Sequence, residues 1–300
     1  MEKQLSQYHA GSSESMTFQV SRRDFLKIAG ITTTLAAMPT AISAILASAG
    51  THGRMLHLTD LYERPALDAK IAGQYLPDSI QPILAYRDGW VRLRHGFAPE
   101  TNIQPMLTAR TTRVDRIPAV VEVIAPYAAV RRWCAADAPL VARPGHGAVL
   151  EAVSALDDRY GDRWLQVALS EASNGWIQAQ QVQPVEPIPA SRQAYHARIE
   201  NHRLTLLSEN HDIAQFALAC PPDIPTGEHR VIQRIPAFHR ADYSGIPWRL
   251  ETNRGLVVHG AYWHNQFACR NSESMTAELS VIAARSVYML LSEGSSIFVG

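Results

Sequence analysis

Hydrophobic and polar positions alternate in short runs along residues 55–185, and turn residues separate the runs. At residues 83–93, an apolar run leads to Arg87-Asp88-Gly89, after which Val91 and Leu93 alternate with arginines. An Asp-Gly pair between apolar runs favours a hairpin, and a period of two is typical of a half-buried strand. The pattern therefore predicts short antiparallel strands in this half of the chain.

Three blocks of this region share a turn, a tryptophan and an alternating strand: "DGWVRL" at 88–93, "GDRWLQV" at 161–167 and "NGWIQAQ" at 174–180. Residues 119–123 add a further strand-like run. Strands of this kind at this spacing resemble small SH3-like barrels, of which residues 50–185 would hold one or two. An unrelated β meander with tryptophans in its core is the other interpretation.

The pattern changes after a proline-rich stretch, "QPVEPIPA". Proline lacks the N–H that a central strand needs, so residues 186–194 are predicted to be a linker. Beyond it, the pattern predicts a hairpin turning at Asn201-His202, a continuously apolar and therefore buried strand, and a single amphipathic helix. The predicted ranges are 199–206 for the hairpin, 213–220, 255–259 and 296–299 for strands, and 276–291 for the helix. The fold class is therefore mainly β.

The first 49 residues have the features of an export signal. Ser21-Arg22-Arg23-Asp24-Phe25-Leu26-Lys27 precedes an apolar, Ala- and Thr-rich run at 28–47, and Ala47-Ser48-Ala49 supplies a small-x-small cleavage site. Paired arginines before Phe-Leu-Lys indicate the twin-arginine (Tat) type, so the mature chain is expected to start near Gly50 and to work in the cell envelope, periplasmic or extracellular. The alternative is an uncleaved signal that tethers the protein to a membrane.

Composition excludes several classes of protein. The chain has 28 Lys+Arg against 28 Asp+Glu, and 46% of its residues are hydrophobic. A nucleic-acid-binding protein usually has a basic excess, and a disordered chain has too few apolar residues to form a core. Cys134, Cys220 and Cys269 are too few and too scattered for a disulfide scaffold or a four-cysteine zinc site. No motif for a cofactor is present.

The densest group of chemically capable side chains follows the buried strand, in "GLVVHGAYWHNQF" at 255–267. His259, Tyr262, Trp263, His264 and Asn265 lie within seven residues of one another, and residues at a strand end often line a cleft. Two histidines could bind a metal, but their spacing is not that of a zinc helix and no carboxylate follows nearby. Polar loop residues that pack at an edge are a second interpretation.

This stretch resembles the catalytic domain of the L,D-transpeptidases, the YkuD family of peptidoglycan cross-linking enzymes. Two further segments resemble that domain, "IENHRLTLL" and "IPTGEHRV", so the resemblance covers residues 195–300. It implies a β sandwich or barrel with one helix. In the family, a histidine-activated cysteine attacks a stem-peptide carbonyl, and backbone N–H groups hold the oxyanion.

The resemblance also shows what this chain lacks. It places the strand-end histidine of the family at His259 and the Ser/Thr-His-Gly-Cys-x-Asn motif at residues 272–277, where the sequence reads Ser-Glu-Ser-Met-Thr-Ala. Glu273 stands at the position of the histidine and Met275 at that of the cysteine. A thioether is a poor nucleophile and an ionised carboxylate is a weak base, so we expect a pseudoenzyme. Stem peptides would bind to Tyr262, Trp263, His264 and Asn265.

Two alternatives remain from the sequence. Cys269 lies six residues before Met275 and could act as a substitute nucleophile, which would make the chain an active transpeptidase or carboxypeptidase. Cys220 is interpreted as a core residue. The other alternative is a structural or interaction module that does not bind peptidoglycan. Metals, cofactors and nucleic acids are not expected as partners.

Overall fold

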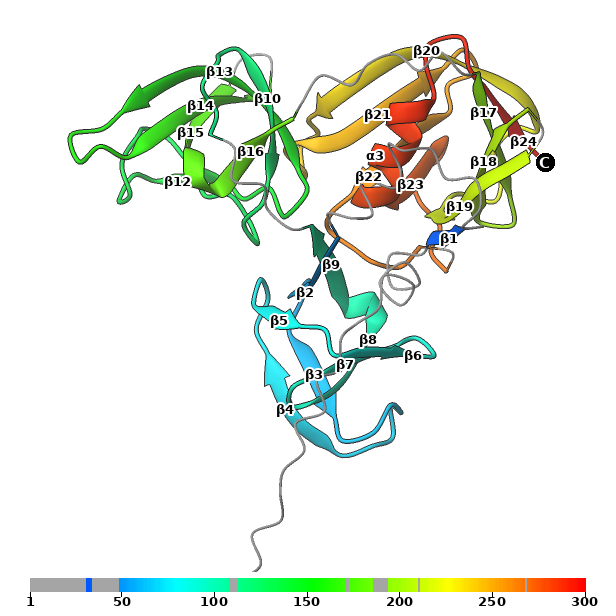
Figure 1. Ribbon diagram of the computed structural model, residues 1–300, viewed down its shortest axis with the longest axis horizontal. Helices are drawn as coiled ribbons and strands as arrows, with labels where there is room; N and C mark the ends of the chain where they lie inside the picture. Colours follow the sequence, from blue (N-terminus) through cyan, green and yellow to red (C-terminus); the bar gives the residue numbers. More distant parts are fainter. Residues whose placement is uncertain are drawn as a thin grey trace, which may run out of the picture.

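The computed structural model describes residues 31–33, 49–107, 113–170, 173–185, 194–209, 211–267 and 269–300. The predicted export signal lies outside these residues except for 31–33 and 49, and so does the predicted linker except for residue 194. The described chain is mainly β, as predicted, and forms two small modules and a larger C-terminal domain (Figure 1). None of the helices described is long and apolar enough to span a membrane.

The first module, residues 49–107, consists of two small antiparallel sheets in the orders β5-β2-β9 and β4-β3-β8-β7-β6. Its elements are β2 (Ala49–Met55), β3 (Thr59–Tyr62), β4 (Ile71–Tyr75), β5 (Ile80–Pro82), β6 (Ala85–Arg87), β7 (Trp90–Leu93), β8 (Gly96–Pro99), the 3-10 turn η1 (Glu100–Asn102) and β9 (Ile103–Leu107). The predicted hairpin is confirmed: Asp88 and Gly89 connect β6 to β7 with positive φ angles of 47° and 81°. The core of this module is separate from that of the other two units.

The second module, residues 113–185, is one antiparallel sheet in the order β12-β11-β15-β14-β13-β10-β16. Its elements are β10 (Ala119–Val123), β11 (Val130–Arg131), β12 (Leu140–Ala142), β13 (Val149–Asp157), β14 (Arg163–Ser170), β15 (Ser173–Gln178), the 3-10 turn η2 (Ala179–Gln181) and β16 (Val182–Pro184). The turn predicted at Asn174-Gly175 is wrong, because both residues lie within β15, paired with β14. Pro184 ends an edge strand, where its missing N–H costs no ladder hydrogen bond.

Both modules follow one chain plan. A long loop after β3 is closed by a hydrogen bond of 3.0 Å from the Glu63 N–H to the Lys70 carbonyl, and the loop after β11 is closed identically from Arg132 to Pro139. In each module a 3-10 turn, η1 or η2, leads into the last strand. The repeated style in the sequence thus corresponds to a repeated architecture of strands, long loop and 3-10 turn.

The C-terminal domain is a nine-stranded sheet in the order β1-β19-β18-β17-β24-β20-β21-β22-β23, and an additional β19–β23 pairing closes it into a barrel. Its elements are β1 (Ile31–Thr33), β17 (Tyr195–Glu200), β18 (Arg203–Ser208), β19 (His211–Ala219), β20 (Gly227–Phe238), β21 (Ile246–Thr252), β22 (Val257–Ala261), β23 (Thr276–Ser280), α3 (Val281–Leu290) and β24 (Ser296–Val299). The predicted hairpin is confirmed, and its turn residues Asn201 and His202 have φ angles of 50° and 56°.

The predicted helix at 276–291 begins five residues too early. Residues 276–280 form β23, which pairs in parallel with β22, and α3 starts at Val281. Ser280 is the N-cap, and its side chain accepts a hydrogen bond of 3.3 Å from the Ala283 N–H. Glu278 therefore belongs to a strand beside β22 and not to the first turn of a helix, which gives its carboxylate a different role.

The hydrophobic core runs without interruption from the second module into the C-terminal domain. The loop before β13 inserts into this junction: Gly147 has a φ of 80°, and an added Cβ would lie 2.7 Å from a Val281 methyl at the start of α3. On the same side, the buried Glu122 of β10 accepts a hydrogen bond of 3.1 Å from Arg285 of α3. These contacts fix α3 relative to the second module.

Candidate functional site

His259 lies in the middle of β22 and is buried, with 2% of its surface exposed. Burial is the main cause that lowers the pKa of its imidazole, because the charged form loses hydration. The ring nitrogen Nδ1 lies 3.1 Å from the Gly260 carbonyl oxygen, and the ring centroid lies 6.0 Å from that of Trp263. The residue opposite His259 in the parallel register is Glu278.

His264 is bound by its neighbours on both ring nitrogens. Its Nδ1 accepts a hydrogen bond of 3.1 Å from the Gln266 N–H, so Nε2 carries the hydrogen that is donated to Glu278 at 3.0 Å. Burial alone would raise the pKa of the Glu278 carboxyl, but the hydrogen bond from His264 lowers it overall. Both side chains are buried, so this pair holds the loop after β22 onto β23.

Asn265 connects the same loop to the first module. Its Nδ2 donates hydrogen bonds of 3.0 Å to the carbonyl oxygen of Glu100, the first residue of η1, and of 2.8 Å to that of Ile103, directly after η1. The side chain is 8% exposed. Two of the four residues expected to bind substrate, His264 and Asn265, are thus occupied by contacts within the chain.

Tyr262 and Trp263 belong to an aromatic cluster completed by Tyr243. Trp263 stacks on Tyr243 with ring centroids 4.0 Å apart and an interplanar angle of 18°, and Tyr262 meets Trp263 edge-on at 5.1 Å. The Tyr262 hydroxyl donates a hydrogen bond of 2.8 Å to the Ser244 carbonyl, and burial raises the pKa of its phenol. Tyr262 is buried, whereas Tyr243 and Trp263 are half-buried and open to solvent on one side.

A cleft of about 340 Å³ opens beside this cluster, where all three units meet. Its lining comprises Arg54 and Leu56 of the first module, Val141, Ala142, Arg143 and Pro144 of the second, and Ala241, Asp242, Tyr243, Ser244, Tyr262 and Trp263 of the C-terminal domain. Arg143 is ion-paired with Asp78 at 3.0 Å and lies 3.9 Å above the Tyr127 ring. The cleft thus combines aromatic faces with guanidinium groups and one carboxylate, which suits a ligand that has both peptide bonds and charges.

Arg54 and His146 hold the three units together below this cleft. Arg54 donates to Asp78 at 2.7 Å, to the Gln104 amide oxygen at 2.9 Å and to the Tyr262 carbonyl at 3.3 Å. His146 Nε2 accepts a hydrogen bond of 2.9 Å from the Leu107 N–H, so Nε2 carries no hydrogen and the imidazole is uncharged. Burial is the main cause that lowers the pKa of His146 to about 4.

The nucleophile motif is expected at residues 272–277, which comprise the end of the loop after β22 and the first two residues of β23. Glu273 forms a two-bonded ion pair with Arg240, at 2.8 and 2.6 Å, and the Ser272 hydroxyl donates to the Thr276 carbonyl. Met275, which stands at the position of the motif's cysteine, has a left-handed backbone with a φ of 58°. Methionine is an unusual residue for this conformation, which glycine adopts without strain.

Among the described residues, neither Cys269 nor Cys220 is seen in contact with His259. Cys269 is exposed, and its Sγ donates to the Gln266 carbonyl at 3.4 Å. Cys220 is buried at the end of β19, with its Sγ 3.5 Å from Nδ1 of His202, and burial raises the pKa of its thiol. Within the described ranges, no group of three His, Cys, Asp or Glu side chains is placed to hold a metal ion.

The sequence did not identify Arg54, His146, Tyr243 or Glu278 as members of this region. Arg54 and His146 lie far away in the chain and reach the site only through domain docking, for which a single sequence contains no signal. Tyr243 lies in a polar loop whose direction depends on β20 and β21. Glu278 could have been found by extending the strand pattern of "TAELS", which alternates as a half-buried strand does.

Comparisons with known proteins give structural neighbours only. No family model matches the sequence, and no curated protein matches it. Solved structures of L,D-transpeptidases match over part of the chain. The structure from Stackebrandtia nassauensis is 11% identical, with 38% of this chain and 58% of that chain covered and a TM-score of 0.32.

Two further structural neighbours match with similarly low identities and TM-scores. An L,D-transpeptidase structure from Xylanimonas cellulosilytica is 12% identical over 39% of this chain and 65% of that chain, with a TM-score of 0.31. One from Mycobacterium tuberculosis H37Rv is 13% identical over 61% of this chain and 98% of that chain, with a TM-score of 0.32. This chain thus spans less than two thirds of the length of the first two structures.

Proposed function

We propose that this chain is an exported cell-envelope protein that binds peptidoglycan stem peptides without cleaving or joining them. The proposal rests first on the sequence: a twin-arginine signal pattern at the N-terminus and three segments in the order of an L,D-transpeptidase domain. The strands and the helix of the C-terminal domain agree with the β barrel and single helix that this resemblance implies.

The observation that carries the inactive assignment is the pairing of β22 with β23. His259 faces Glu278 in the parallel register, and the residue with left-handed backbone before β23 is Met275. With Met275 aligned to the cysteine of the motif, the group is a thioether. With the motif shifted by one residue, so that Met275 takes the place of the glycine, the group is the hydroxyl of Thr276, which donates to the Ser274 carbonyl. Neither register supplies a thiol.

The cleft at the junction of the three units is the binding site in this proposal. Trp263 and Tyr243 offer aromatic faces for alanine methyl groups and peptide planes, and Arg143 lies at the rim for a stem carboxylate. His264 and Asn265 would act indirectly, since their hydrogen bonds fix the loop that carries Trp263.

Titration of the protein with a purified tetrapeptide stem tests the binding, followed by NMR chemical shifts and calorimetry. Saturable binding with shifts at Trp263 is expected, weakened about tenfold by Trp263→Ala, since a buried aromatic contact contributes about 1–2 kcal/mol. Trp133→Ala is the matched control, because Trp133 is 49% exposed and does not line the cleft. Absence of binding, or equal weakening by both variants, would leave a structural or interaction module as the better assignment.

Cys269 provides the test of the alternative active enzyme. Its exposed thiol could be acylated by a β-lactam of the carbapenem class, which would add the mass of the drug to the chain. No adduct is expected on incubation of the wild-type chain. An adduct that disappears in Cys269→Ser, together with turnover of a stem peptide, would establish the active alternative.

A further inference from the structure

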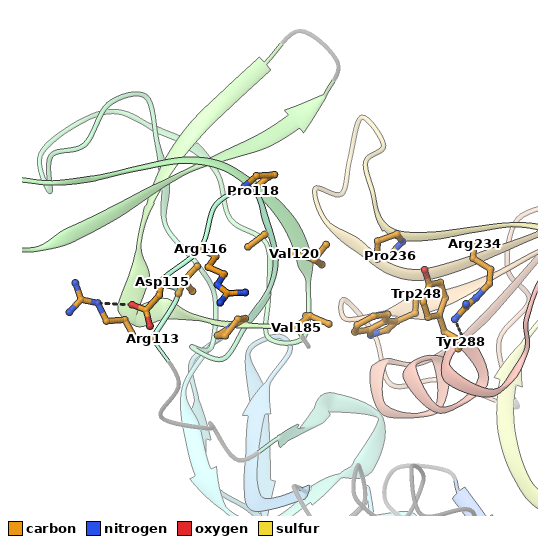
Figure 2. A pocket seen from close by; sticks show the side chains of 13 residues that line it. Arg113, Asp115, Arg116, Pro118, Val120, Val185, Arg234, Pro236, Trp248 and Tyr288 are labelled. Atoms are coloured by element: carbon orange, nitrogen blue, oxygen red, sulfur yellow. Dashed lines mark hydrogen bonds and ion pairs between the residues drawn. The ribbon is translucent and has the colours of Figure 1, made fainter. Parts of the chain in front are cut away.

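A larger cavity, of about 740 Å³, lies between the second module and the C-terminal domain (Figure 2). Arg113, Arg116 and Val120 contribute to it from the second module, and Arg234, Trp248 and Tyr288 from the C-terminal domain. It shares no lining residue with the cleft at Trp263. Its size is within the range of pockets that bind small molecules, about 300–1,000 Å³.

Trp248 is held in an unfavourable backbone conformation beside this cavity. Its φ is 63°, and only 1% of its surface is exposed. A bulky residue in the left-handed region is strained, and such strain tends to occur at ligand sites. The indole extends from β21 toward Val185 and packs against Tyr288, with ring centroids 5.3 Å apart (Figure 2).

Two buried donors at this end of the cavity have no acceptor. The Trp248 Nε1–H and the Arg234 Nε–H are both inaccessible to solvent and make no hydrogen bond in the described structure. The remaining part of the Arg234 guanidinium donates to the Tyr288 carbonyl at 2.5 Å and lies 4.4 Å from the Tyr288 ring centroid. A buried donor without an acceptor is unfavourable, so these two groups add to the cost of the Trp248 conformation at this wall of the cavity.

The charges around the cavity favour an anion. Arg113, Arg116 and Arg234 line it, and the carboxylate of Asp115 is the acidic group among the lining residues. Asp115 is already paired with Arg113 at 3.4 Å, whereas Arg116 has no ion-pair partner among the described residues. Arg116, on the second-module side of the cavity, is therefore without a carboxylate partner among the described residues, whereas Arg234 is bound to the Tyr288 carbonyl (Figure 2). Guanidinium groups bind carboxylates and phosphates through paired N–H donors.

We propose that this cavity is a second binding site, for an anionic ligand that joins a carboxylate or phosphate group to an apolar body. The anionic group binds to Arg116, and the apolar body packs against Val120, Trp248 and Tyr288. Binding here bridges the second module and the C-terminal domain. The ligand is distinct from a stem peptide held at the Trp263 cleft, so this proposal and the proposed function stand or fall separately.

Calorimetry with three small probes tests the proposal on the full chain. N-acetylphenylalanine carries a carboxylate on an apolar body, phenyl phosphate carries a phosphate, and N-acetylphenylalanine amide has the same body without the charge. Saturable binding of at least one acidic probe is expected, with the amide about tenfold weaker, since a hydrogen bond to a charged group is stronger than one to a neutral group. The stronger of the two acids identifies the anionic group.

Variants locate the binding. Arg116→Gln changes an exposed side chain and is expected to weaken the acidic probe about fivefold to tenfold. Arg132→Gln removes the same charge from an exposed loop of the same module, outside the cavity, and is expected to leave the affinity within twofold. Trp263→Ala should likewise have no effect. The proposal is overturned if neither acid binds saturably, if the amide binds equally well, or if Arg116→Gln and Arg132→Gln weaken binding alike.

Discussion

The imidazole of His264 donates a hydrogen bond of 3.0 Å to the carboxylate of Glu278, and both side chains are buried. This contact fastens the loop after β22 to the strand that lies directly beside β22. The same ring accepts a hydrogen bond of 3.1 Å from the Gln266 N–H at Nδ1, so Nε2 carries the hydrogen that is donated. His264, which the sequence predicts as a substrate ligand, has its hydrogen-bonding groups satisfied within the chain.

Removing the Glu278 carboxylate should therefore be costly to folding. Glu278→Ala is expected to lower the free energy of unfolding by about 2–3 kcal/mol, because it leaves the buried Nε2–H of His264 without an acceptor. Glu273→Ala is the matched control: its ion pair with Arg240 is largely exposed at Glu273, at 66%, and should contribute less than about 1 kcal/mol. Urea unfolding of both variants measures the difference. Equal losses would show that the His264–Glu278 pair has no special role.

The junction below the cleft should make stability depend on pH. His146 is neutral in the folded protein and its pKa is lowered to about 4, whereas an unfolded histidine titrates near 6.5. Between these two pH values the unfolded chain binds more protons than the folded chain. The contribution of His146 to the free energy of unfolding is therefore fully present above pH 6.5 and is lost as the pH falls toward 4. From pH 7 to pH 5 the loss from His146 alone is about 2 kcal/mol.

The measurement is the free energy of unfolding across this range, in the wild-type chain and in His146→Gln. The variant should have a lower free energy of unfolding than the wild type at pH 7, but this free energy should fall less between pH 7 and pH 5. His239 and His259 also have pKa values lowered chiefly by burial, so part of the pH dependence will remain. An unchanged slope in His146→Gln would show that His146 does not titrate as the structure implies.

Asn265 should decide how firmly the first module is attached. Asn265→Ala removes two hydrogen bonds to carbonyls near η1, each of which contributes about 1 kcal/mol. Faster hydrogen exchange in β8 and β9 is expected, with little change in β17 and β18. Asn253→Ala, which removes an exposed hydrogen bond of 2.8 Å to the Arg230 N–H, should leave the first module unchanged. Identical exchange profiles for the two variants would contradict a docking role for Asn265.

A pair of glycines tests the contact between the second module and α3. Gly147 and Gly161 have nearly the same φ, 80° and 85°, so alanine causes similar backbone strain at each, about 1–2 kcal/mol. At Gly147 the added Cβ would also meet Val281 at 2.7 Å, whereas at Gly161 nothing lies within 4 Å. Gly147→Ala is expected to lower the melting temperature clearly more than Gly161→Ala. Similar shifts in melting temperature for the two variants would show that the contact between Gly147 and Val281 adjusts to a Cβ at little cost.

The sequence predicts those strands and turns whose conformation depends on neighbouring residues in the chain. The Asp88-Gly89 and Asn201-His202 turns, the buried strand around His259 and the final strand all follow from local residue types and periodicity. The start of α3 could not be placed in this way. Residues 276–280 carry apolar positions that fit a helix, but pairing with β22 gives them a strand conformation.

The composition of the site follows the sequence less closely than the fold does. The aromatic residues Tyr262 and Trp263 do reach a cleft, as a loop after a buried strand often does. The docking of the first module onto Asn265 and the pairing of His264 with Glu278 depend on contacts between distant segments. A single sequence holds no periodicity that reports such contacts. The stem-peptide ligand and the loss of catalysis therefore stay predictions until binding and turnover are measured.

Incubation of the purified chain with tetrapeptide-stem muropeptides, with products followed by mass spectrometry, addresses the catalytic question most directly. Among the described residues no cysteine is seen in contact with His259, and Met275 and Thr276 stand at the candidate positions, which predicts bound but chemically unchanged muropeptide. Formation of a cross-linked or shortened stem peptide, abolished by a single substitution between residues 264 and 276, would contradict this account.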